Sequence, residues 1–263
     1  MLFDKSSAAE KPVNATQTDV SVEKNSSFFA DHLDSYSRDV QGLDTYINIR
    51  SSINQAIRGS ELLLDIGNGG VFDYDTHAAS HIVALDLFLD SLPENYRCPQ
   101  NVTLRTGSAL AIPELNESFD TVVMVMLLHH LVGNTVQESM LNVRRAFGEA
   151  YRVLKPRGKL VIIESCVPSW FFGFEKLLFP LVAPIINAAI QHPATLQYPA
   201  SFIGRLLADE TGQPPEMIKI SMGRWVLQFG WKVPSFVTPV APYRFVIQKP
   251  DLWNMPGSVN GGQ

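Results

Sequence analysis

Cysteine is scarce in this chain of 263 residues: only Cys98 and Cys166 are present, and they lie far apart in the sequence. Two distant cysteines argue against a disulfide framework, and their spacing is not that of a zinc site. We therefore expect two reduced thiols, a cytoplasmic protein and no bound metal.

Basic residues are not in excess either. The 21 Lys and Arg residues are outnumbered by 26 Asp and Glu, which gives a net charge of -5. A protein that binds nucleic acid usually concentrates basic residues in one patch. The dispersed basic residues here argue against a nucleic-acid partner and favour a small or neutral substrate.

Long apolar runs are also missing. The first 24 residues contain no run that could serve as a signal peptide, and we expect them to be a disordered lead. The most apolar stretch begins at Trp170, but Glu175, Lys176, Pro180 and Pro184 interrupt it. A membrane span needs about 20 uninterrupted apolar residues, so a transmembrane helix is not expected there.

The most informative pattern is present in residues 61–86, ELLLDIGNGGVFDYDTHAASHIVALD. A short apolar run ends on Asp65 and is followed by a glycine-rich turn, as expected for a buried parallel strand that leads into a ligand-binding loop. A second apolar run ends on Asp86, roughly 20 residues after the turn, where an acid can accept hydrogen bonds from both ribose hydroxyls of an adenosine cofactor.

These residues resemble the first motif of the class I S-adenosylmethionine-dependent methyltransferases, an acid and an apolar residue before Gly-x-Gly-x-Gly. Asp65, Gly67 and Gly69 match the motif, whereas Val71 stands where the third glycine is usual. A dinucleotide-binding dehydrogenase would need glycine in place of Phe72, and a triphosphate-binding loop would need Gly-Lys-Ser/Thr. The acidic loop that follows suits a cationic cofactor, although its acids could equally be ordinary turn residues.

Later segments extend the resemblance. Gly107-Ser108-Ala109 stands where the family often has Gly-Asp-Ala, so Ser108 replaces the acid that holds the adenine amino group. Residues 149–165, EAYRVLKPRGKLVIIES, are similar to the family's helix, turn and fifth strand. Residues 223–250 resemble its last helix and two strands, the strands being a hairpin of residues 233–238 with 243–248.

The resemblance implies an α/β fold: a Rossmann-like, doubly wound, seven-stranded sheet of order 3-2-1-4-5-7-6, with an antiparallel last strand. The segment after the fifth strand departs from the family pattern, and we expect it to be an inserted helical lid. The expected organisation is a lead over residues 1–24, cap helices over 25–60, a cofactor-binding core over 61–166, an apolar lid over 167–213, a C-terminal helix and strands over 214–249, and a tail over 250–263. The implied cofactor is S-adenosylmethionine, bound by Asp65, Gly67, Asn68, Gly69, Gly70, Asp86, Leu87, Ser108, Ala109 and Met126.

Two histidines follow the predicted fourth strand, in Leu127-Leu128-His129-His130-Leu131. A neutral imidazole can accept a proton from a hydroxyl, a phenol or an activated carbon. It can equally bond to the backbone at the start of a helix. We predict that one of them is catalytic and favour His130 over His129; Glu164 either faces the substrate or is a structural acid.

The predicted lid carries the aromatic residues expected to enclose an acceptor. Trp170, Phe171, Phe174 and Glu175 are its candidate contacts, and the competing interpretation is a patch that touches a membrane surface or a second copy of the chain. The sequence thus predicts methyl transfer to an O or C atom of an apolar small molecule. The alternatives are a non-catalytic relative that acts as a binding module, suggested by Val71 and Ser108, and a membrane-surface protein.

Overall fold

The computed structural model describes residues 43–189, 195–228 and 231–251. The predicted lead, the first cap helix and most of the predicted tail lie outside these residues, as does part of the predicted lid. The second cap helix is present as α2 (Asp44–Ile57), whose Ile49, Ile53 and Ile57 are buried. Within the described part of the chain, no helix has the length and apolar character needed to cross a membrane.

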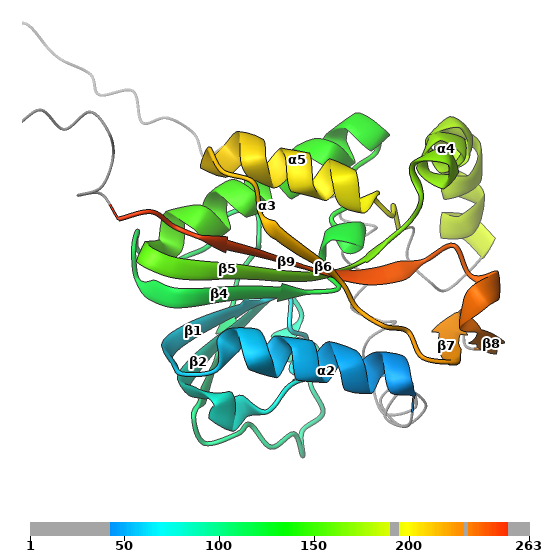
Figure 1. The fold of residues 1–263 in the computed structure, drawn as a ribbon. Coiled ribbons are helices and arrows are strands. Elements are labelled where there is room, and N and C mark those ends of the chain that lie inside the picture. Colours follow the sequence, from blue (N-terminus) through cyan, green and yellow to red (C-terminus); the bar gives the residue numbers. More distant parts are fainter. Residues whose placement is uncertain (1–42, 190–194, 229–230, 252–263) are drawn as a thin grey trace, which may run out of the picture.

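The centre of the fold is a seven-stranded sheet in the order β3-β2-β1-β4-β5-β9-β6 (Figure 1). Five parallel strands form most of it, and β9 (Ala241–Gln248) runs antiparallel between β5 and β6 (Glu216–Lys219). The parallel strands are β1 (Ser60–Ile66), β2 (Ala79–Asp86), β3 (Val102–Thr106), β4 (Phe119–Val125) and β5 (Leu154–Cys166). The predicted Rossmann-like fold and its strand order are confirmed.

The hairpin predicted at the end of the chain is wrong. The partner of β9 at the sheet edge is β6, not residues 233–238. Residues expected to form the last helix instead include β7 (Trp225–Gln228), which pairs with β8 (Trp231–Pro234) in a separate two-stranded sheet. Proline cannot donate to a strand ladder, so Pro234 ends β8, and a 3₁₀ turn (Ser235–Val237) follows where the predicted strand would continue.

Helices cover both faces of the sheet (Figure 1). On one face lies α2, and on the other lie α3 (Val136–Val153) and α5 (Ala200–Thr211), which contact each other. Two apolar clusters fill the spaces between these layers, one on each face. The last core helix is therefore α5, inside the segment predicted to be lid.

The helix α4 (Ser169–Ala189) follows β5 and lies beyond the carboxyl ends of the parallel strands, on the same side of the molecule as β7 and β8 (Figure 1). The small β7–β8 sheet is attached to α2: the Thr45 hydroxyl donates to the Met222 carbonyl, and the Asn48 side chain donates to the Ser221 carbonyl at 3.0 Å. In a doubly wound sheet, ligands bind at the carboxyl ends of the strands, so these elements flank the expected site.

Candidate functional site

The glycine-rich turn leaves β1 at the carboxyl edge of the sheet. Gly67, Gly69 and Gly70 all have positive φ angles, between 61° and 81°, which other residues rarely adopt. A Cβ atom on Gly67 would lie 2.5 Å from the Leu127 side chain, and one on Gly70 would lie 2.5 Å from the Leu92 side chain. A Cβ atom on Gly69 would meet nothing within 4 Å. The turn therefore presents open backbone at Gly69.

Asp86 ends β2 beside this turn and shapes it. One carboxylate oxygen accepts a hydrogen bond from the Gly69 amide at 2.9 Å, and the other accepts one from the Phe88 amide at 2.8 Å. Burial raises the pKa of Asp86, while the backbone amides act in the opposite direction. Each carboxylate oxygen retains a second lone pair, so Asp86 can hold the turn and still accept from a ligand; the adjacent Leu87 is half-buried.

Asp65, at the end of β1, also stabilises the glycine-rich turn. It is buried, and one of its oxygens accepts hydrogen bonds from the Tyr74 hydroxyl at 2.7 Å and from the Asn68 side-chain amide at 2.6 Å. The Asn68 side chain also donates to the Val71 carbonyl and accepts from the Gly70 amide. Asp65 and Asn68, both predicted to contact the cofactor, thus use their polar groups to fix the conformation of the loop.

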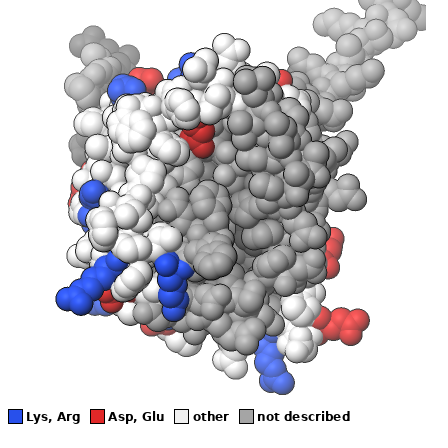
Figure 2. All heavy atoms as spheres, turned by 90° about the vertical axis from the view of Figure 1, so that its right-hand side faces the viewer, with Lys and Arg blue, Asp and Glu red and all other residues white. Residues whose placement is uncertain are grey.

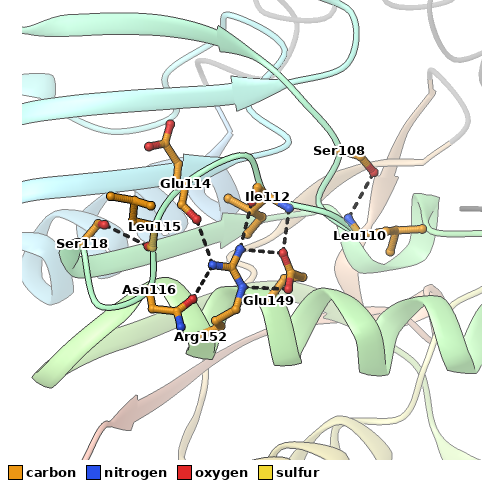
Figure 3. A network of polar contacts seen from close by, with 9 residues as sticks. All are labelled: Ser108, Leu110, Ile112, Glu114, Leu115, Asn116, Ser118, Glu149 and Arg152. Atoms are coloured by element: carbon orange, nitrogen blue, oxygen red, sulfur yellow. Dashed lines mark hydrogen bonds and ion pairs between the residues drawn. The ribbon is translucent and has the colours of Figure 1, made fainter. Parts of the chain in front are cut away.

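A third loop lies after β3 and carries Ser108 and Ala109, both half-buried. The Ser108 hydroxyl accepts a hydrogen bond from the Leu110 amide at 3.1 Å. Arg152 of α3 anchors the rest of the loop by donating to the Ile112 and Glu114 carbonyls, while Glu149 accepts from the Ile112 amide (Figure 3). The loop predicted to face adenine is therefore held in place from α3.

The histidine pair follows β4, as predicted. Met126, the first residue after the strand, has a φ angle of +52°, and a 3₁₀ turn of Leu128–His130 comes next. The two imidazole rings lie 4.1 Å apart between centroids. A non-glycine residue with positive φ is strained and is found preferentially at functional sites.

Glu164, near the end of β5, binds the first of these histidines. Its carboxylate accepts from His129 Nδ1 at 2.7 Å, from the Leu128 amide at 2.8 Å and from the Ser165 amide at 2.7 Å, and it is fully buried. When Nδ1 of the neutral ring carries the proton and donates a hydrogen bond to Glu164, Nε2 has a free lone pair. This arrangement fixes the ring and prepares Nε2 to accept a proton.

The predicted lid contacts divide into two groups. The side chains of Trp170 and Phe174 are 71% and 60% exposed and face solvent, and the half-buried Phe171 packs edge-on against Trp170. Glu175 instead lies near the histidines: burial raises its pKa to about 7, and the hydrogen bond from the Gln197 backbone amide and the nearby His129 act in the opposite direction. Only Glu175 of this set is brought to the site.

Comparisons with known proteins point to one family. Residues 64–162 match the family model of the methyltransferase domain. A demethylmenaquinone methyltransferase of Renibacterium salmoninarum is 27% identical over 187 residues, which cover 69% of this chain and 70% of that protein. A methyltransferase-like protein of Schizosaccharomyces pombe is 32% identical over 126 residues, or 45% of each chain. These matches support a class I S-adenosylmethionine-dependent methyltransferase.

A solved structure agrees with the fold of the methyltransferase. The Burkholderia thailandensis 1,6-didemethyltoxoflavin-N1-methyltransferase, determined with 1,6-didemethyltoxoflavin and S-adenosylhomocysteine, superposes with a TM-score of 0.57 at 14% identity. The superposition covers 92% of this chain and 94% of that one. At this identity the comparison concerns the fold alone.

The described residues fit the predicted cofactor of the methyltransferase, S-adenosylmethionine. Open space at Gly69 allows a ligand to approach the backbone, and Asp86 beside it has lone pairs for ribose hydroxyls. Ser108, Ala109 and Met126 line the same edge at the ends of β3 and β4. The role of each of these residues toward the cofactor stays a prediction.

Sequence reasoning missed several residues of the methyltransferase site. Tyr74, Gln197 and Tyr198 were not singled out, and the part that Glu164 plays was left open. Tyr74 stands in the acidic loop after the glycines, and its bond to Asp65 spans nine positions. Gln197 and Tyr198 reach the site through the path of the chain between α4 and α5, for which the sequence carries no motif.

The pKa of Asp65 gives a testable pH dependence. Burial raises this pKa from its ordinary value to about 7, although the bonds from Tyr74 and Asn68 oppose the shift. A carboxyl group that is easier to protonate in the folded state stabilises the fold below its unfolded pKa, and that stabilisation is lost as pH rises toward 7. In the parent we expect the free energy of unfolding to fall by up to about 1.4 kcal/mol per pH unit between about pH 4 and 7. We expect Asp65→Asn to abolish this fall.

Urea denaturation of the parent and of Asp65→Asn at several pH values checks this expectation. The difference between their unfolding free energies should change across this range and level off above pH 7. Parallel profiles would show that Asp65 titrates normally in the folded protein. Asp75→Asn is the matched control, because this exposed acid only caps the following 3₁₀ turn through the His77 amide.

Proposed function

We propose that this methyltransferase moves the methyl group of S-adenosylmethionine to an O or C atom of an apolar small molecule, with His129 as the general base. The observation that carries the proposal is the 2.7 Å contact between His129 Nδ1 and the buried carboxylate of Glu164. A base of this kind is needed when the acceptor must lose a proton, as a hydroxyl or an acidic carbon does. It is not needed for an amine that reacts as the free base.

The reaction requires little other chemistry from the protein. The cofactor supplies an activated methyl group on a sulfonium, and much of the acceleration comes from holding the acceptor in line with it. As the new bond forms, the acceptor proton passes to His129 Nε2. Glu164 then faces an imidazolium, whose charge it stabilises across the Nδ1 hydrogen bond. The same carboxylate holds the Leu128 amide, so the ring stays aligned with the strand end.

Two further facts support an apolar acceptor. The segments that follow β5 contribute an aromatic group, Phe172, Tyr198 and Phe202, whose rings lie 5.2 to 6.1 Å apart. The Renibacterium relative is named for demethylmenaquinone. We carry over only the apolar character of that substrate and leave its identity open.

A transfer assay tests the proposal. The purified protein is incubated with S-adenosylmethionine labelled in the methyl group and with separate panels of phenols, 1,3-diketones and primary amines that carry apolar groups. We expect label in products of the phenols or diketones and none in the amines. Label confined to the amines would contradict O- or C-methylation. Binding of the cofactor, measured by calorimetry, shows in parallel that the protein is folded and competent.

A second candidate function is contact with a membrane surface, through an exposed apolar stripe on α4. Trp170, Phe174 and Leu177 are 71%, 60% and 72% exposed, and their spacing places them on one face of the helix. Figure 2 views the side of the molecule on which α4 lies, and the described side chains there are mostly uncharged. An apolar acceptor dissolved in a membrane would be reached from such a surface.

Co-sedimentation with phosphatidylcholine vesicles tests this second candidate. We expect the double variant Trp170→Ser and Phe174→Ser to bind vesicles at least about 10-fold more weakly than the parent, since each buried aromatic side chain contributes roughly 1.5 to 3 kcal/mol. Leu115→Ser with Leu141→Ser is the matched control, because both residues are exposed and lie on other elements. Equal sedimentation of the parent and the double variant would contradict membrane contact, and a change in elution volume alone would indicate self-association instead.

A further inference from the structure

Three polar side-chain atoms close to the histidine pair have no hydrogen-bond partner among the described residues. They are Glu175 Oε2 on α4, Gln197 Oε1 and the Tyr198 hydroxyl, and all three atoms are buried. A buried polar atom without a partner costs about 1 to 3 kcal/mol, and native proteins contain few of them. Three in one region indicate a place where a ligand supplies the missing partners.

Gln197 and Tyr198 are brought to the catalytic edge by the segment that precedes α5. The Leu196 amide donates to the His129 carbonyl at 3.1 Å, and the Val167 amide donates to the Tyr198 carbonyl at 3.2 Å. The Gln197 side chain donates to the Ser165 hydroxyl at 3.4 Å. The segment thus lies along the ends of β4 and β5, beside the pair formed by His129 and Glu164.

Glu175 approaches the same place from the helix α4. Its carboxylate accepts a hydrogen bond from the Gln197 backbone amide and feels the charge of His129. One carboxylate oxygen remains without a partner. The lid helix therefore contributes a polar atom to the catalytic edge, although the exposed faces of Trp170 and Phe174 point away from it.

The Tyr198 ring is held rigidly while its hydroxyl is unpaired. The ring stacks on Phe202, with centroids 5.2 Å apart and planes 18° apart, and it packs against Phe172 at 5.8 Å. No part of Tyr198 is exposed. A buried tyrosine hydroxyl normally finds a partner, and its fixed position here gives a ligand a defined donor.

The protonation of the group favours an uncharged ligand. Burial raises the pKa of Glu175 to about 7, and burial together with the charges of Glu164 and Glu175 raises the pKa of Tyr198. Glu164 already accepts from His129 and from the amides of Leu128 and Ser165, so its charge is compensated within the protein. The Gln197 amide and the Tyr198 hydroxyl are neutral, and Glu175 is protonated in part near pH 7. A hydroxyl group, which both donates and accepts, matches this mixture of donors and acceptors.

We propose that Glu175, Gln197 and Tyr198 form a subsite that binds an uncharged hydroxyl group of the methyl acceptor, next to the His129–Glu164 pair. The inference rests on the proposed function, because it places the acceptor beside His129. It adds that the acceptor carries a hydroxyl group that is recognised separately from the atom that is methylated. An acceptor with only one oxygen function would leave the subsite unfilled.

Binding of simple probes tests the subsite without any turnover. The protein is saturated with S-adenosylhomocysteine and titrated with 4-hexylresorcinol, which has two hydroxyl groups, with 2-hexylphenol, which has one, and with hexylamine. We expect the parent to bind 4-hexylresorcinol about 10-fold more tightly than 2-hexylphenol, as one added hydrogen bond allows. In Tyr198→Phe and in Gln197→Met the ratio should fall to near one.

The same titrations, carried out on a control variant, decide whether the subsite exists. Tyr151→Phe should keep the parent ratio, because Tyr151 lies on α3 beside Lys249, at the opposite end of β5. A thermal melt of Tyr198→Phe should show no loss of stability, because the hydroxyl has no partner to lose. A ratio near one in the parent, an unchanged ratio in both variants, or tighter binding of hexylamine than of 4-hexylresorcinol would each overturn the subsite. Failure of the transfer assay with the ratio intact would count against the proposed function alone.

Discussion

Replacing His129 with alanine should lower the rate of methyl transfer by about 10² to 10⁴-fold, the usual contribution of a general base. The reason is geometric, because His129 lies at the carboxyl end of β4 and Glu164 holds its Nδ1 at 2.7 Å. Affinity for the cofactor should change little, since Asp86 and the glycine-rich turn belong to other elements. The measurement is single-turnover transfer to a phenolic acceptor found in the panel, alongside calorimetric titration of the cofactor.

Two further variants separate chemistry from folding in this experiment. Glu164→Gln keeps the shape of the side chain but removes the charge that stabilises an imidazolium, so the rate of methyl transfer should fall while the affinity for the cofactor is kept. His130→Ala tests the histidine that the sequence favoured, and its ring lies 4.1 Å from that of His129. A folded His129→Ala protein that transfers methyl at the parent rate would rule out His129 as the base, and loss in His130→Ala alone would restore the original preference.

Removal of the Asp86 carboxylate should have the largest effect on cofactor affinity. Asp86→Ala is expected to weaken binding of S-adenosylmethionine by about 2 to 3 kcal/mol, because two ribose hydroxyls lose a charged acceptor in a partly desolvated cleft. The Gly69 and Phe88 amides lose the same acceptor, so the turn also becomes less ordered. Calorimetric titration measures the change directly.

Asp90→Ala serves as the matched control, because Asp90 is an exposed acid four residues further along the chain. Its removal changes the net charge by the same amount and should leave the affinity within about twofold, since exposed charges interact weakly through water. A thermal melt of each variant excludes unfolding as the cause of weaker binding. Equal affinities of the parent and Asp86→Ala would contradict the ribose assignment.

Much of the sheet could be predicted because its central strands carry strong local patterns. Apolar runs ending on Asp65 and Asp86 mark two adjacent strands, and the apolar run over residues 160–163 marks the fifth, although residues 155–158, expected to form a turn, already belong to β5. The sixth strand was missed because Glu216–Lys219 is short and all four of its residues are exposed, so it has no apolar pattern of its own. Its place in the sheet depends on pairing with β9, whose partner residues lie 24 to 30 positions later in the chain.

The site was predicted less completely because its contacts join distant parts of the chain. The sequence places His129 and Glu164 at the ends of two strands but says nothing about their register. In the structure Val125, the last residue of β4, pairs with Ile163, so the chain turns toward His129 directly beside Glu164, which continues β5, and the two side chains meet. The bonds from Tyr74 and Asn68 to Asp65 could not be predicted either, because the motif indicates only a contact with the cofactor, which stays a prediction.

The several hydrogen bonds of Glu164 affect which residues of the site would change first in a relative that no longer needs catalysis. A lineage released from selection for catalysis would be free to replace His129, because only the proton acceptor would be lost. It would not be equally free to replace Glu164, because the amides of Leu128 and Ser165 depend on the same buried carboxylate. Inactive descendants should therefore retain the glutamate and lose the imidazole. The presence of both His129 and Glu164, and not of Glu164 alone, would distinguish an active enzyme from an inactive relative.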